Sequence, residues 1–232
     1  MPDTLQRRRE LLEKVGLFEG LEPEDYDVLL PLLQYKTFVR DQVIVEVGED
    51  GEALFLVEHG RLKVVLHDNQ EREVILAFLK EGEYFGEMAL LDQKPRSASV
   101  VALSTTHLFS LPRDAFLSYV DEHPRTLLHL LRKQFERLRL ADEIRRDLVL
   151  LDVYGRVARL LLQLAQDEGE WTEEGTLLRN PPSQQQIASM IGSSRETVSR
   201  TVNELMKTGT LVKVGRKLLI TSEWNLYNQI EN

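Results

Sequence analysis

The fold of this chain is decided by residues 84–100, which read YFGEMALLDQKPRSASV. An apolar pair typical of a strand ends at Gly86, where a bare backbone lets a ligand approach closely. A short helical turn is expected next, and its free N–H groups suit an anion. Glu87 offers an acceptor for a sugar hydroxyl, while Arg96 and the hydroxyl of Ser97 offer donors for a phosphate. The segment therefore predicts a pocket for a ligand that carries both groups.

This segment resembles the phosphate-binding cassette of cyclic-nucleotide-binding domains, in which Gly-Glu and an apolar residue are followed downstream by Arg-Ser-Ala. The positions of that pattern are filled by Gly86, Glu87, Met88, Arg96, Ser97 and Ala98. The resemblance implies that Glu87 holds the ribose 2′-hydroxyl and that Arg96 and Ser97 hold the cyclic phosphate. It also implies that Arg137 braces Glu87. The alternative is a solvent-facing Glu and Arg in a regulator that no longer binds nucleotide.

Recognition of the base is less defined. In the cyclic AMP receptor proteins, two adjacent hydroxyl residues on a long helix contact the adenine, and aligning residues 151–156 places Ala141 and Asp142 at those positions. An ionised Asp142 only accepts hydrogen bonds, from the adenine amino group or from two adjacent donors of guanine. Alternatively, Asp142 pairs with Arg137 or Arg145 across a dimer. Cyclic AMP is the expected effector, with cyclic GMP or cyclic di-GMP as alternatives.

Short apolar runs surround the cassette on both sides, and glycines separate them. Such runs occur at 43–45, 54–57, 62–66, 74–79, 99–103 and 108–111, after an amphipathic helical stretch at 5–17. Several short strands with regular turn signals predict a β-sandwich or a barrel-like roll. Because helical segments dominate the rest of the chain, the expected fold class is α+β, a β-roll followed by helices.

Residues 126–150 contain no proline or glycine and are expected to form one long helix. Apolar residues recur at spacings of three and four, as in a coiled-coil seam, at Leu128, Leu131, Phe135 and Leu138. Asp142 and Arg145 interrupt this seam. A homodimer through the helix is the favoured interpretation, and an ordinary helix packed on its own domain is the alternative.

The C-terminal part has the pattern of a winged helix-turn-helix. Asp152 is expected to cap a helix over 153–166, and a polar hairpin or loop follows at 167–180. Helices are then expected at 183–192 and 193–205, and a hairpin at 211–221. The stretch SSRETVSRTVNELMKTG closely resembles the recognition helix of the cyclic AMP receptor protein and Fnr superfamily of bacterial transcription regulators.

Arg195, Glu196 and Arg200 are the candidate base-reading residues. Arg pairs with guanine O6 and N7, and Glu accepts from cytosine N4. The resemblance implies these contacts, on a palindromic double-stranded DNA site with TGTGA-like half-sites. For Glu196, a capping box with Ser193 is the alternative. Phosphate contacts, which position without specifying sequence, are expected from Ser183, Gln184, Ser194, Thr197 and Arg216.

The charge distribution agrees with a local DNA-binding face despite a formal net charge of −9. Residues 153–232 are neutral overall, and 183–217 hold six basic against two acidic residues. The absence of cysteine excludes disulfides and iron–sulfur clusters, and the five histidines show no metal-ligand spacing. No apolar run is long enough to span a membrane and no signal peptide is apparent, so a cytoplasmic protein is expected.

One carboxylate and one arginine, without a nucleophile or a metal site, make a binding pocket and not a catalytic one, so no enzyme is expected. The predicted domains are a β-roll (1–124), a dimerisation helix (125–151) and a winged helix-turn-helix (152–232). Nucleotide between the roll and the helix would favour one orientation of the winged domains, allowing contact with DNA and RNA polymerase. The rivals are a regulator that acts without nucleotide or answers to another molecule, and a signalling module with no DNA role.

Overall fold

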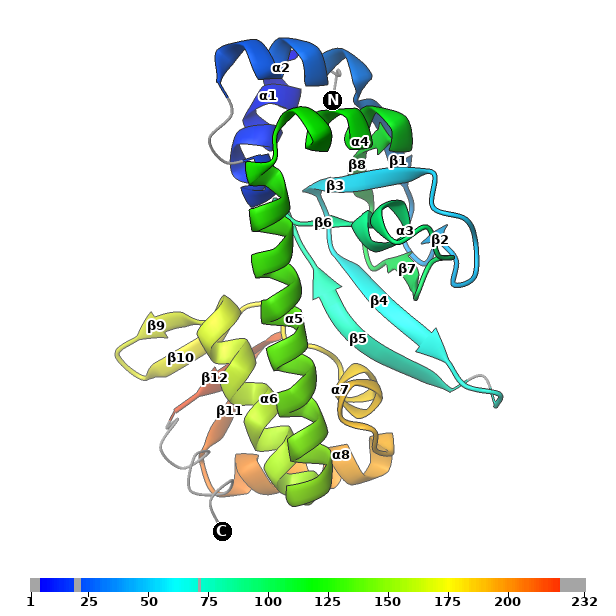
Figure 1. Cartoon of the computed structure of the whole chain (residues 1–232). Coiled ribbons are helices and arrows are strands. Elements are labelled where there is room, and N and C mark those ends of the chain that lie inside the picture. Colours follow the sequence, from blue (N-terminus) through cyan, green and yellow to red (C-terminus); the bar gives the residue numbers. More distant parts are fainter. Residues whose placement is uncertain (1–4, 19–21, 71, 222–232) are drawn as a thin grey trace. The chain divides into compact units, whose positions relative to one another are not determined.

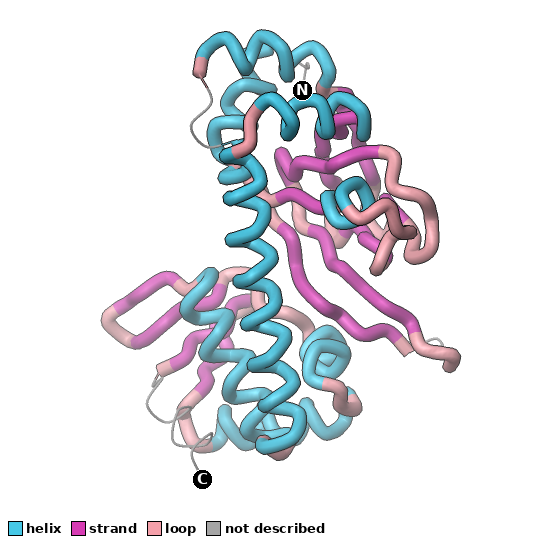
Figure 2. Tube along the Cα trace, viewed as in Figure 1, coloured by secondary structure: helices cyan, strands magenta, loops and turns pink. Residues whose placement is uncertain are grey.

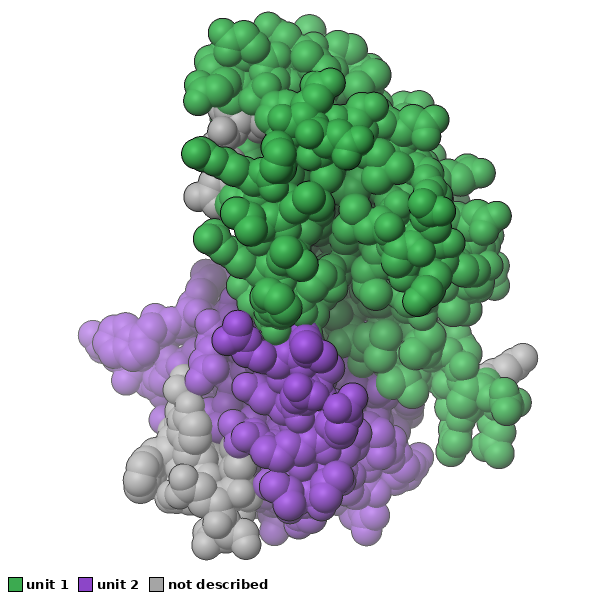
Figure 3. Space-filling view, in the orientation of Figure 1, with its two compact units in different colours: residues 1–137 green, residues 138–232 purple. Residues whose placement is uncertain are grey.

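The computed structural model of the chain describes residues 5–18, 22–70 and 72–221. It divides into two compact units, residues 1–137 and 138–232, shown in green and purple in Figure 3. The boundary falls inside helix α5 (Arg125–Leu150), which corresponds to the long helix predicted at 126–150. The finer division of the chain into three domains stays a prediction.

The first unit is a roll of two four-stranded antiparallel sheets, in the orders β1-β8-β3-β6 and β2-β7-β4-β5. The strands are β1 (Gln34–Phe38), β2 (Val43–Val45), β3 (Ala53–His59), β4 (Leu62–His67), β5 (Glu73–Leu79), β6 (Tyr84–Phe85), β7 (Ser99–Ala102) and β8 (Thr106–Pro112). All six predicted strands are present. The strand β6 corresponds to the apolar pair predicted to end at Gly86, and β1 was not predicted; the two strands complete the first sheet (Figures 1 and 2).

Strand β3 explains how the roll is packed, because it is buried on both faces. Leu54 and Leu56 contribute to a core shared with the helices, and Phe55 and Val57 contribute to the core between the two sheets. This alternation follows from the two-residue period of a strand. The covering helical segments are α1 (Leu5–Lys14), η1 (Gly16–Phe18), α2 (Pro23–Leu29), η2 (Leu30–Leu32) and α4 (Arg113–Glu122).

Helix α5 presents its predicted seam to solvent. Four apolar side chains are each 50–57% exposed, namely Leu128, Leu131, Phe135 and Leu138. On another face of α5, Leu130 is buried in the core of the first unit. The helix therefore packs on its own unit and also presents an apolar seam to solvent, and the dimer stays a prediction. No described helix has the length and apolarity that a membrane span requires.

The second unit contains α6 (Val153–Glu168), α7 (Gln184–Ile191) and α8 (Arg195–Lys207) against a four-stranded sheet. The sheet has the order β11-β12-β10-β9, with β9 (Glu170–Thr172), β10 (Gly175–Leu178), β11 (Leu211–Val214) and β12 (Lys217–Ile220). Asp152 caps α6 as predicted, since its carboxylate accepts from the Gly155 amide at 2.8 Å. The polar segment at 167–180 forms the β9–β10 hairpin, and β10 joins the sheet by pairing with β12.

Candidate effector site and nucleic-acid interface

Gly86 stands between β6 and the short helix α3 (Glu87–Leu91), in a left-handed conformation with φ +92°. A Cβ atom here would lie 2.4 Å from Arg96 Nη1 and 3.1 Å from the carbonyl oxygen of Ala53. Both the dihedral angle and the close approach require glycine. The predicted strand-to-turn transition at Gly86 is therefore confirmed.

Arg96 is the buried cation of the site, with 6% of its surface exposed. Its Nη1 donates to the Gly86 carbonyl and its Nη2 to the Ala53 carbonyl, each at 2.8 Å. Within the described residues it has no carboxylate at ion-pair distance, although an arginine this buried is ordinarily paired. Burial lowers the pKa of Arg96, and the charge of Glu87 is the largest influence in the opposite direction. Three of the five N–H groups of the guanidinium remain for a ligand.

Glu87 is the buried carboxylate of the site, with 1% of its surface exposed. One of its oxygens, Oε1, accepts from Gln134 Nε2 at 2.7 Å and from Arg137 Nη1. The structure thus brings together Glu87 and Arg137, as the resemblance implied. Because Glu87 and Arg96 are both buried, the alternative of a solvent-facing pair is wrong. Gln134 was missed, although a residue three positions before Arg137 lies on the same helix face.

The remaining cassette residues differ in exposure. Ala98 is buried, whereas Met88 and Ser97 are exposed, and the Ser97 hydroxyl has no partner among the described residues. The backbone of the segment is fixed to the loop between β2 and β3, because the Arg96 amide donates to the Glu49 carbonyl at 2.7 Å. Ser97 and Arg96 thus offer one exposed hydroxyl and one buried guanidinium as donors to a phosphate.

Ala141 and Asp142 lie on an exposed part of α5 that belongs to the second unit. Asp142 Oδ1 accepts from Arg145 Nη1 at 3.0 Å. Within the single chain, Asp142 thus pairs with the predicted partner Arg145, because residues three apart share a helix face. A pairing across a dimer stays a prediction. The other predicted partner, Arg137, contacts Glu87 instead.

The helix-turn-helix is built by two capped helices. Ser183 caps α7 in a reciprocal capping box with Gln186, and α7 ends at Gly192, which has φ +65°. Ser194 caps α8 by accepting from the Thr197 amide at 3.2 Å. The proposed capping box of Glu196 with Ser193 is therefore wrong. The cap lies one residue later, so Thr197 and not Glu196 occupies the third helical position.

The candidate base readers are all exposed, whereas Val198, Val202 and Leu205 on the same helix are buried. Hydrogen bonds from its own amide and from the Ser194 hydroxyl lower the pKa of Glu196, so it is ionised at neutral pH. Arg200 Nη2 donates to Thr197 Oγ1 at 3.3 Å. The exposed pair Gly215 and Arg216 forms the two-residue loop between β11 and β12. Gln184, at the start of α7, is half-buried.

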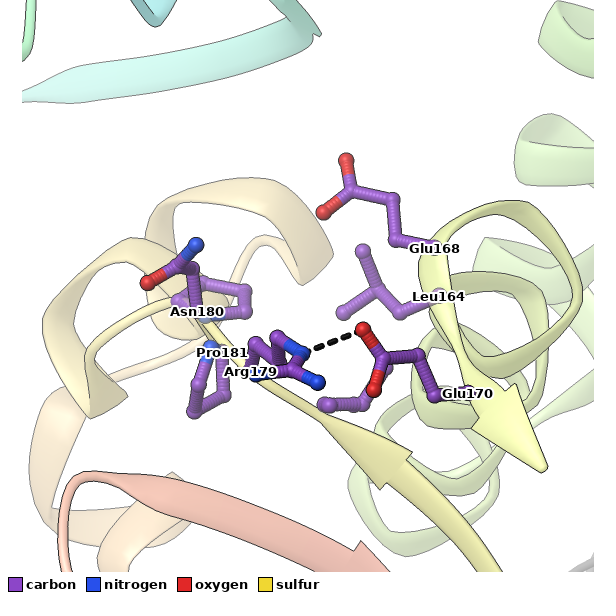
Figure 4. Close-up of a pocket in the computed structure, with 8 residues that line it drawn as sticks. Leu164, Glu168, Glu170, Arg179, Asn180 and Pro181 are labelled. Carbon is purple, nitrogen blue, oxygen red and sulfur yellow. Dashed lines mark hydrogen bonds and ion pairs between the residues drawn. The ribbon is translucent and has the colours of Figure 1, made fainter. Parts of the chain in front are cut away.

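A separate small cavity of about 180 Å³ lies at the base of the β9–β10 hairpin. Figure 4 shows Glu170 and Arg179 pointing toward one another across it, joined by an ion pair. Neither the cassette nor the recognition helix α8 contributes a residue to its lining. Among the described residues, no three His, Asp or Glu side chains are arranged to hold a metal ion.

Comparison with known proteins agrees with both parts of this geometry. The family model of the cyclic nucleotide-binding domain matches residues 35–123, and that of the Crp-like helix-turn-helix domain matches residues 155–227. A relative is the CRP-like cAMP-activated global transcriptional regulator of Mycobacterium tuberculosis. It is 34% identical over 219 residues, which cover 94% of this chain and 97% of that protein. The cyclic AMP receptor protein of Thermus thermophilus is 34% identical, covering 92% of this chain and 95% of that protein.

Solved structures share the fold. CooA from Carboxydothermus hydrogenoformans matches with a TM-score of 0.76 at 24% identity, covering 90% of this chain and 91% of that chain. The c-di-GMP responsive global regulator CLP of Xanthomonas campestris matches with a TM-score of 0.74 at 22% identity, covering 87% of this chain and 100% of that chain. With relatives above 30% identity along nearly its whole length, the chain belongs to the cyclic AMP receptor protein and Fnr superfamily of transcription regulators.

Proposed function

We propose that the protein is a dimeric regulator whose binding to DNA responds to a cyclic nucleotide held by Glu87 and Arg96. The observation that carries this proposal is the buried guanidinium of Arg96, which has no carboxylate at ion-pair distance among the described residues. Burying a cation without a directly paired counter-charge is unfavourable, and an incoming phosphate would relieve that cost. A buried arginine of lowered pKa is typical of a functional site.

Cyclic AMP is the proposed effector, because two relatives that cover nearly the whole chain are named for it. Cyclic di-GMP is the main competitor, since it is named for a protein of the same fold. Cyclic GMP is the third candidate, because the carboxylate of Asp142 would match the adjacent donors of guanine. Its ion pair with Arg145 would have to open first.

The proposed mechanism is a shift between two orientations of the winged helix-turn-helix domains, one from each protomer of the dimer. Glu87 is bonded to the N-terminal half of α5, so a nucleotide that binds Glu87 acts directly on this helix. It favours one state only to the extent that it binds that state more tightly. In the favoured state, recognition helices of the dimer lie roughly 34 Å apart and read successive turns of a palindromic site in cytoplasmic DNA. RNA polymerase is the proposed further partner.

Titration calorimetry with cyclic AMP, cyclic GMP and cyclic di-GMP tests the pocket. Arg96→Ala should abolish binding of the effector, since charge-assisted bonds of roughly 1.5–3 kcal/mol each are lost. Arg96 also bonds two carbonyl oxygens, so Arg96→Lys serves as a second variant with a smaller effect on the fold. Lys94→Ala removes an exposed cation from the same loop and should leave binding unchanged. Unchanged affinity in both Arg96 variants would show that the pocket assignment is wrong.

A further inference from the structure

Gln134 is a part of the effector site for which the family pattern offers no role. Its amide donates to Glu87 Oε1 at 2.7 Å, and Arg137, one helical turn later, donates to the same oxygen. The amide orientation follows from the chemistry, because an ionised carboxylate only accepts and the Nε2 group must therefore face it. Two donors from consecutive turns of α5 thus converge on one oxygen of a buried carboxylate.

The other oxygen of Glu87, Oε2, is left without a donor from the described residues. Oε2 is not fully buried. Among the described residues, the side-chain N and O atoms that are buried without a hydrogen bond are Arg156 Nε and Arg159 Nε, and Oε2 is not one of them. Oε2 therefore keeps contact with solvent while the carboxylate as a whole is 1% exposed. An atom in this situation is poised for one additional hydroxyl donor.

We propose that Gln134 is a positioning residue that holds Oε2 of Glu87 in place for the ribose 2′-hydroxyl, and so sets the preference of the pocket for ribonucleotides. The inference rests on the proposed function of the pocket. Arg137 alone would hold the carboxylate less firmly, because its side chain is 36% exposed and solvent weakens an ion pair. With Gln134 as a second donor on Oε1, rotation of the carboxylate breaks two bonds at once, which keeps Oε2 directed at the ligand.

Equilibrium binding of cyclic AMP and of 2′-deoxy cyclic AMP to the full-length protein tests this role. Gln134→Leu removes the donor at similar volume and should weaken cyclic AMP binding by about ten-fold to one hundred-fold. Binding of the 2′-deoxy nucleotide should not change, because that ligand makes no bond to Oε2. If cyclic GMP binds more tightly to the wild type, it and its 2′-deoxy form are the matched pair.

Lys133→Ala is the matched control, since Lys133 neighbours Gln134 on α5 but pairs with Glu136 at 3.4 Å on the helix surface. It should alter neither affinity. Equal weakening of both nucleotides by Gln134→Leu would indicate a general structural role, and no weakening of either would indicate no role; each result overturns the inference. Failure of the pocket itself has a different signature, because Arg96→Ala would then leave binding of the ribonucleotide unchanged.

Discussion

At the scale of single residues, Gly86 and Arg96 constrain each other. The guanidinium of Arg96 occupies the space that a Cβ at position 86 would need, and it bonds the carbonyl of that same residue. The absence of a side chain at Gly86 thus makes room for the guanidinium of Arg96 itself and not only for a ligand. The arginine is held by carbonyl oxygens and not by a carboxylate, so its charge stays available to a phosphate.

Single residues of the second unit should separate base reading from phosphate binding. Arg200→Ala should cost about 1–3 kcal/mol on a preferred TGTGA-like site and relax discrimination at one guanine, because Arg200 is an exposed base-reading candidate on α8. Arg216→Ala, in the β11–β12 loop, should weaken binding about equally on all sequences. It should also reduce the slope of the logarithm of the binding constant against the logarithm of salt concentration by about one.

Binding isotherms on preferred and scrambled DNA, measured over a salt series with effector present, distinguish these two effects. If Arg200→Ala weakened binding to both DNAs equally, Arg200 would be a phosphate contact and not a base reader. The winged helix-turn-helix would survive that result, because it rests on the packing of α7, α8 and the β-sheet and not on one arginine.

At the scale of elements, the junction between α4 and α5 is held by His123. Its Nδ1 lies 3.0 Å from the carbonyl oxygen of Tyr119, and its Nε2 lies 2.8 Å from Oδ1 of Asp25 on α2. Both partners are acceptors, so only the doubly protonated imidazolium satisfies them together. The ring of Tyr119 stacks on the imidazole at 4.4 Å. This arrangement connects α2 to the start of the helix that carries Gln134 and Arg137.

The pKa values of the pair agree with this geometry. Burial acts to lower the pKa of His123, but the hydrogen bonds to Asp25 and Tyr119 and the charges of Asp25 and Glu122 raise it above its ordinary 6.5. Burial likewise acts to raise the pKa of Asp25, and the bonds from His123 and the Glu22 amide outweigh it and lower the pKa below 3.8. The two shifts define the pH range in which the pair is charged.

The stability contributed by His123 is complete below pH 6.5 and is lost as the pH rises through its higher folded value. The stability contributed by Asp25 is complete above pH 3.8 and is lost as the pH falls through the lower pKa that Asp25 has in the folded protein. We therefore expect the melting temperature to fall by about 2–4 °C above neutral pH, given about 1 kcal/mol for a partly exposed pair. His123→Gln and Asp25→Asn should each remove this pH-dependent component.

Thermal melts from pH 6 to pH 9 check this expectation. A profile that His123→Gln leaves unchanged would show that the junction carries no titrating contribution to stability.

At the scale of the whole molecule, the seam of α5 is an apolar surface that a single chain leaves exposed to solvent. Its four apolar side chains stand at coiled-coil spacing, on a helix whose N-terminal half is hydrogen-bonded to the carboxylate of Glu87. A two-fold dimer through this seam would bury them and would supply the two half-site readers that a palindrome requires.

Sedimentation at micromolar concentration should therefore show a dimer. Phe135→Asp should raise the dimer dissociation constant on the order of a hundred-fold, since a half-exposed Phe is withdrawn from water in each of two copies and a charge takes its place. Val28→Asp changes an exposed apolar residue of α2 and should leave the dimer intact. A monomer in the wild type, with and without effector, would contradict the dimer.

The sequence alone determined the order of the β-roll and the winged helix-turn-helix and pointed to the segment of the candidate site. Short apolar runs separated by glycines predicted six strands of the roll, and Asp152 marked the start of a helix. The cassette at 84–100 pointed to Glu87 and Arg96, and the family resemblance pointed to Arg137. These features were predictable because helix caps and strand periods depend on neighbours in the chain. The cassette was recognisable because its chemistry is concentrated in one short segment.

Only the tertiary structure decided the contacts that join distant segments. Gln134 reaches Glu87 across 47 positions and His123 reaches Asp25 across 98, and no periodicity in the sequence relates such residues. The same holds for the two carbonyls that fix Arg96, since backbone acceptors are present at every position and sequence cannot say which are near. The local error at Ser193 has a related cause. Adjacent serines offer the same capping chemistry, and the choice of Ser194 depends on where the turn from α7 places the backbone.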